Sequence, residues 1–137
     1  MRLDWGNYGT RAAKEKKILI VEDDQEIGRL YLDLLMTETN SVVILANEPF
    51  QALNIVDKFK PDLFILDYML PHMDGLELYN RLHTIKGLEK IPALFITGTI
   101  LDKKGKEPGI VRMQKPFDID ILLQTIDNIT TPLPSTA

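Results

Sequence analysis

Cysteine is absent from the 137 residues, and histidine occurs only at His72 and His83. The lack of cysteine excludes a disulfide scaffold, and the two histidines are poorly placed to support a zinc site. No apolar run is long enough to span a bilayer, and residues 1–17 lack the apolar stretch of a signal peptide. These absences predict a soluble, cytoplasmic protein with no membrane partner.

An excess of positive charge is also missing, since the formal net charge is −4. An acidic chain is an unsuitable direct partner for DNA or RNA. No glycine-rich phosphate loop follows the first apolar run, so nucleotide binding lacks support. The remaining composition, 45% hydrophobic and 26% charged, is that of one ordinary globular domain.

An acidic residue, Asp67, ends a pattern typical of a buried strand. It follows residues 63–66, a short and bounded apolar run of the kind found in central strands of parallel sheets. Pro71 and Gly75 then predict a sharp turn. The carboxylate is therefore expected on a loop at the carboxyl edge of the sheet, where open α/β folds bind their ligands.

Three further acids, Glu22, Asp23 and Asp24, follow a second apolar run at residues 17–21. Two such runs in parallel bring their terminal carboxylates to one edge. At an effective dielectric constant near 20, like charges about 4 Å apart repel by roughly 4 kcal/mol. The cluster therefore needs a retained proton or a divalent cation, and oxygen ligands at a shallow site favour Mg²⁺.

Hydrophobic periodicity alternates between strand and helix along the chain. Strands are expected at residues 17–22, 41–46, 62–67, 92–97 and 110–113, and helices at 24–38, 47–59, 75–86 and 118–129. This order predicts an α/β fold with a doubly wound, five-stranded parallel sheet. The fourth helix is expected to be short or irregular, because glycine and proline recur within residues 98–109.

Local signals place the helix starts and the core-facing sides of the helices. Asp24, Asn47 and Asp118 are expected as N-caps, with Pro49 in a first turn. Helical spacing assigns the following side chains to the core: Ile27, Leu30, Tyr31, Leu34 and Leu35; Leu53 and Val56; Leu76, Leu78, Tyr79 and Leu82; Ile121, Leu122, Thr125 and Ile126. Residues 1–16 are interpreted as a flexible arm, 17–129 as the domain, and 130–137 as a tail or the start of a linker.

Four separated signals together resemble the receiver domain of two-component response regulators. They are Glu22-Asp23, Asp67 with Pro71 and Gly75, Thr97 at a strand end, and Lys115-Pro116-Phe117. Each is weak alone, but the spacing is specific: 44 residues from Asp23 to Asp67 and 30 from Asp67 to Thr97. The resemblance covers about residues 17–129 and implies the flavodoxin-like (βα)5 fold.

The resemblance implies phosphoryl chemistry at Asp67. This residue would accept a phosphoryl group from a histidine kinase or a histidine phosphotransfer protein. Thr97 would donate its hydroxyl to a phosphoryl oxygen, and Lys115 would pair with Asp67 or its phosphate. A cis peptide bond is expected before Pro116. Since the domain would phosphorylate and dephosphorylate only itself, it is not expected to be an enzyme.

The resemblance also implies a magnesium site. Asp23, Asp67 and the backbone carbonyl of Met69 would bind Mg²⁺, and Glu22 would reach it through water. Met69 and Thr99 stand where the family tunes the lifetime of the phosphoryl group. An apolar Met69 should hinder an attacking water, which predicts slow to moderate self-dephosphorylation.

The sequence departs from the family pattern on the side that normally signals. Arg112 stands where receivers usually carry an aromatic residue, three positions before the lysine, and only 18 residues separate Thr97 from Lys115. A rotating aromatic ring cannot carry the signal at an arginine. Arg112 is expected either to be a solvated surface residue or to reach acidic groups of a partner or of the site.

Two other functions remain open. A pseudo-receiver would act as a protein-interaction scaffold without phosphorylation. An aspartyl-nucleophile phosphatase would want a second acid two residues after Asp67, where this chain has Met69. The sequence does not distinguish a stand-alone regulator from part of a longer protein, and it names neither kinase nor output. A downstream protein target or a fused output domain is the expected second partner.

Overall fold

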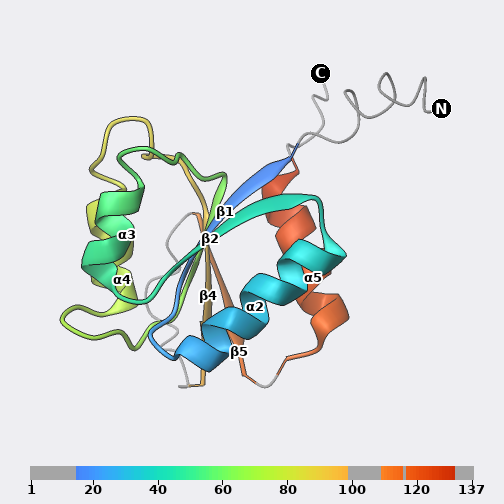
Figure 1. Ribbon diagram of the computed structural model, residues 1–137. Helices are drawn as coiled ribbons and strands as arrows, with labels where there is room; N and C mark the ends of the chain where they lie inside the picture. Colours follow the sequence, from blue (N-terminus) through green and yellow to red (C-terminus); the bar gives the residue numbers. More distant parts are fainter. Residues whose placement is uncertain (1–14, 99–108, 116, 132–137) are drawn as a thin grey trace, which may run out of the picture.

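The predicted apolar runs form a single parallel sheet in the computed structural model (Figure 1). The structure describes residues 15–98, 109–115 and 117–131, with Thr97 described by its backbone only. The strand order is β2-β1-β3-β4-β5. The strands are β1 Lys16–Val21, β2 Ser41–Ala46, β3 Leu63–Leu66, β4 Ala93–Thr97 and β5 Ile110–Gln114. The predicted five-stranded parallel sheet is confirmed.

Helices cover both faces of the sheet. Those in the described residues are α2 Gln25–Glu38, α3 Pro49–Ile55, α4 Gly75–Leu82 and α5 Ile119–Thr130. Figure 1 shows α2 and α5 on one face and α3 and α4 on the other. None of these helices has the length and hydrophobicity needed to cross a bilayer.

The two faces of each central strand build two separate cores. In β1, Leu19 and Val21 join Ala52 and Val56 from the α3 region and Leu78 of α4 in one cluster. Alternate β1 and β3 residues join α2 and α5 in the other cluster, which includes Ile18, Ile20, Ile65, Tyr31, Leu35, Leu122 and Ile126. Successive strand residues point to opposite faces, so a strand covered on both sides must be apolar throughout. This requirement explains why the runs are continuous and not alternating.

Two of the three predicted caps are confirmed. The Asp24 side chain accepts hydrogen bonds from the backbone N–H groups of Glu26 and Ile27, and Asp118 caps α5 in the same way. The third prediction was wrong, because Glu48 and not Asn47 caps α3. The Glu48 side chain reaches forward to the free N–H groups of Phe50 and Gln51, which leaves Asn47 available for another contact.

Two predicted core residues and two helix ends also need correction. Leu30 and Ile121 are 64% and 54% exposed, since the buried stripes of α2 and α5 run through their neighbours Tyr31 and Leu122. Helices α3 and α4 end at Ile55 and Leu82, before the predicted residues 59 and 86. Beyond both ends the chain continues in tighter turns with i→i−3 backbone hydrogen bonds.

Several expectations fall outside the described residues. They concern the structure of residues 1–14, the irregular fourth helix within 99–108, the peptide bond before Pro116, and residues 132–137. The domain was predicted over residues 17–129, and in the structure β1 begins at Lys16 and α5 ends at Thr130.

Close packing at the start of α4 requires a glycine. A Cβ atom added to Gly75 would collide with the carbonyl oxygen of Asp67 and would lie 3.0 Å from the Tyr68 Cα. Both atoms belong to the backbone and cannot rotate away. The Gly75 N–H also donates to the Tyr68 carbonyl at 2.8 Å, which closes the loop after β3.

Gly75→Ala is therefore expected to destabilise the fold by about 2–3 kcal/mol, because the added methyl group forces the backbone after β3 to move. Urea unfolding followed by circular dichroism measures this loss. Gly98→Ala is the matched control, since no described atom lies within 4 Å of a Cβ added there. Equal stability of the two variants would contradict the packing argument.

Candidate functional site

Three carboxylates meet at the carboxyl edge of the sheet. Glu22 and Asp23 directly follow β1, and Asp67 directly follows β3. These strands are parallel neighbours with Val21 paired to Leu66, so the residues after them emerge side by side. One carboxylate oxygen from each of the three residues lies within 4.8 Å of the others. The predicted convergence of acids from two strands is therefore present.

Glu22 is the buried member of this cluster, with 3% exposure. Its carboxylate accepts a hydrogen bond from the Asp24 N–H at 3.1 Å and lies 3.8 Å from the Lys115 Nζ. Burial raises the pKa of the Glu22 carboxyl from 4.5 to about 7, and the Asp67 and Asp23 carboxylates add to the rise. The Asp24 N–H and Lys115 oppose it without cancelling it.

Lys115, which follows the edge strand β5, brings a positive charge to the cluster. This strand lies two strands away from β3. The resemblance implied a pair with Asp67 or its phosphate, and the ion pair found is with Glu22. Since Glu22 and Asp67 belong to the same cluster, the ammonium group lies at its border.

The loop after β3 holds Asp67 through its backbone. The Asp67 N–H donates to the Val21 carbonyl at 3.1 Å, which continues the pairing of β3 with β1. The Met69 N–H donates to Asp67 Oδ1 at 3.2 Å, while the Met69 side chain is 61% exposed. His72 completes the turn with a φ of +72°, a left-handed conformation that histidine tolerates better than most residues.

Thr97 ends β4, the strand between β3 and β5, and pairs with Gln114. Its backbone therefore lies at the same sheet edge as Asp67 and Lys115. The side chain lies outside the described residues, so its hydroxyl remains a prediction.

Sequence reasoning missed the contact of Asn47 with the site. Its Nδ2 donates to the Glu22 carbonyl at 3.4 Å, from the loop that follows β2. Only the strand order, with β2 beside β1, reveals this approach. Arg112 lies in β5 opposite Phe95 and is half-buried, which differs from the first of the two alternatives, an exposed surface residue. The second alternative, a contact with acidic groups, stays a prediction.

The chemistry of the cluster fits a hard divalent cation. The three acids offer only oxygen ligands, from a buried, a half-buried and an exposed residue. Because Asp23 is exposed and Asp67 half-buried, the cluster is open to water on one side. Mg²⁺ retains several water ligands when it binds proteins. A cation there would offset the like-charge repulsion from Asp67 and Asp23, which adds to the effect of burial on the pKa of Glu22.

Glu22→Gln is expected to stabilise the metal-free protein increasingly as pH rises. Because the pKa is about 7 in the folded state and ordinarily 4.5, charging this buried group costs nothing below about pH 4.5 and its full amount above about pH 7. The attraction of Lys115 is already included in this pKa, and the expected gain is about 1–2 kcal/mol at pH 8 and smaller at pH 5.

Urea unfolding in EDTA at the two pH values measures the gain of the Glu22→Gln variant. Glu26→Gln, at an exposed position of α2, is the matched control. A gain of the same size at pH 5 and pH 8 would show that Glu22 does not change its charge in this range.

Comparison with known proteins places this site in a family. The sequence model of the response regulator receiver domain matches residues 18–127. The chain is 36% identical over 107 residues to "Sporulation initiation phosphotransferase F" of Bacillus subtilis, covering 77% of this chain and 86% of that protein. It is 35% identical over 117 residues to "Probable transcriptional regulator ycf29" of Pyropia yezoensis, covering 82% of this chain. The chain spans about half the length (52%) of that second relative.

Solved structures show the same fold. The receiver domain of the hybrid histidine kinase CckA matches with a TM-score of 0.71 and 27% identity, over 84% of this chain and 99% of that one. The receiver domain of the sensor histidine kinase PA1611 from Pseudomonas aeruginosa, solved with magnesium in its active-site cleft, matches with a TM-score of 0.74 and 20% identity, over 85% and 98%. The match across residues 18–127 and the shared flavodoxin-like fold show that the chain belongs to the response regulator receiver domain family of two-component systems.

Proposed function

We propose that this receiver accepts a phosphoryl group on Asp67 from a phosphohistidine. The observation that carries the proposal is the convergence of Glu22, Asp23 and Asp67 within 4.8 Å, with the Lys115 ammonium 3.8 Å from Glu22. The donor is a histidine kinase or a histidine phosphotransfer protein. Asp67 directly follows β3, the middle strand of the sheet, and is half-buried, whereas Glu22 is buried. Its N–H donates to the Val21 carbonyl, and its carboxylate accepts from the Met69 N–H.

In the proposed transfer, a carboxylate oxygen of Asp67 attacks phosphorus. The phosphorus–nitrogen bond of the donor breaks, and its electron pair stays on the imidazole. Lys115 offsets the negative charge that the site gains, and Thr97 donates its hydroxyl to a phosphoryl oxygen. The Asp67 N–H donates to the Val21 carbonyl, and the Asp67 carboxylate accepts from the Met69 N–H. These hydrogen bonds hold the attacking carboxylate in place, which lowers the entropy cost of orienting it.

The residues that would hold Mg²⁺ are Asp23, Asp67 and the Met69 carbonyl, with Glu22 acting through water. When bound, the ion would neutralise charge on the transferring phosphoryl oxygens. Met69 supplies no acid or base two residues after Asp67, which disfavours rapid hydrolysis and an aspartyl-nucleophile phosphatase alike. The domain thus changes its own state and turns over no separate substrate.

The output is a change in binding to a downstream protein or a fused output domain. Either output is compatible with the relatives. The chain covers 86% of the Bacillus subtilis phosphotransferase, which leaves little room there for a fused domain, but only 52% of the Pyropia regulator. Direct nucleic-acid binding by this domain is disfavoured by its net charge of −4. The cytoplasm, where phosphohistidine donors are found, is the proposed location.

One observation favours a second function, that of a scaffold without phosphorylation. Arg112 occupies the place of the switching aromatic residue and lies half-buried in β5. A receiver that binds its partner without switching would not need an aromatic residue there. Phosphorylation of the folded protein in the presence of Mg²⁺ separates the two functions.

Incubation with Mg²⁺ and a small acyl phosphate is expected to add one phosphoryl group, because an activated donor can replace the kinase. Intact-protein mass spectrometry detects the gain. It should vanish in Asp67→Asn and persist in Asp33→Asn, an exposed acid of α2 outside the cluster. No gain in a parent that still binds Mg²⁺ would favour the scaffold.

Mg²⁺ alone is expected to raise the Tm of the parent, because a ligand that binds only the folded state stabilises it by about 1.4 kcal/mol at ten times its Kd. Differential scanning fluorimetry over a Mg²⁺ series measures the shift. Asp23→Asn should abolish most of it and Asp33→Asn should not. An unchanged shift in Asp23→Asn would place the ion elsewhere.

A further inference from the structure

A second feature lies at the other end of the sheet from the acidic cluster. A cleft of about 840 Å³ opens where β1 and β4 begin and where α2 and α5 end. Its apolar floor combines one fully buried and several half-buried side chains, namely Ile126, Leu123 and Ile129 of α5 with Ile91 and Pro92. Nothing in the phosphoryl chemistry uses this cleft.

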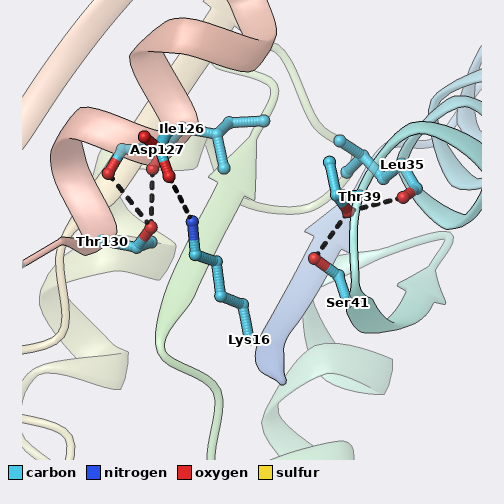
Figure 2. A network of polar contacts seen from close by, with 7 residues as sticks. All are labelled: Lys16, Leu35, Thr39, Ser41, Ile126, Asp127 and Thr130. Atoms are coloured by element: carbon cyan, nitrogen blue, oxygen red, sulfur yellow. Dashed lines mark hydrogen bonds and ion pairs between the residues drawn. The ribbon is translucent and has the colours of Figure 1, made fainter. Parts of the chain in front are cut away.

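The rim of the cleft is acidic. Lys16 neutralises Asp127 through an ion pair of 2.9 Å that joins β1 to α5 (Figure 2). Glu15, Glu38 and Asp62 also line the cleft, and none of them forms an ion pair with another described residue. The cleft therefore suits an occupant that combines apolar surface with positive charge.

We propose that residues 1–14 of the same chain occupy this cleft. They carry Arg2, Arg11 and Lys14 against the single acid Asp4, so their side-chain charge is opposite to that of the rim. Trp5 and Tyr8 supply the apolar surface for the floor, and aromatic rings with a polar edge suit a half-open site.

The position of the segment in the chain supports this occupant over a separate partner. Residue 14 is bonded to Glu15, which itself lines the cleft, so the segment is held beside its proposed site. Fourteen residues reach at most about 50 Å, and a tether of this length gives a high effective concentration. The Lys16–Asp127 ion pair already connects the start of β1 to the end of α5. Docking of residues 1–14 would add a second connection between them.

Trp5 is the only tryptophan of the chain, so its fluorescence reports the proposed contact in the full-length protein. In the folded chain its acrylamide quenching constant is expected to be about threefold below that of the urea-unfolded chain, because one ring face is shielded from water. Glu38→Lys should raise the constant about twofold by placing a like charge on the rim. Asp33→Lys, on the same helix but away from the cleft, is the matched control and should leave it unchanged.

Three outcomes would overturn the proposal. Equal quenching in the folded and unfolded chains would show that Trp5 is free in solution. Shielding that Glu38→Lys and Asp33→Lys alter equally would place Trp5 at another surface. Shielding that disappears on dilution would show that the occupant comes from a second copy of the chain.

Discussion

The parallel pairing of β1 with β3 is the constraint on which the site depends. Its register sets Val21 beside Leu66, so Glu22 and Asp67 must emerge next to each other. Charge crowding follows directly, and it adds to the burial that raises the pKa of Glu22. The Asp24 N–H and Lys115 reduce the cost of this crowding, but they leave three acids around a space suited to a cation.

The rest of the fold keeps these groups in place. Continuous apolar strands with a core on each face leave little freedom for the strand ends to move. The loop after Asp67 is pressed against the start of α4, where only Gly75 fits. The carboxylates at these strand ends thus lie in fixed positions, which would lower the cost of orienting them in the proposed phosphoryl transfer.

The two ends of the sheet have different chemical characters. The carboxyl edge gathers acids around an open space, and the amino edge combines an apolar floor with an acidic rim. Arg112 in β5 belongs to neither end and marks the departure from the usual signalling design. Membership of the receiver family therefore leaves the proposed signalling route of this chain open, because Arg112 stands where the family pattern has an aromatic residue.

Local chemistry made much of this structure predictable from sequence. The β2 bounds, the Asp24 and Asp118 caps and the acids at two strand ends depend on neighbouring residues, and the sequence alone determined them. Asn47 and Glu48 both precede Pro49, so the choice of cap needed the three-dimensional geometry. Tertiary structure alone decided the burial of Glu22, its pair with Lys115 and its contact with Asn47. These contacts join residues far apart in the chain, and the order β2-β1-β3 that creates them is set by packing and not by any local pattern.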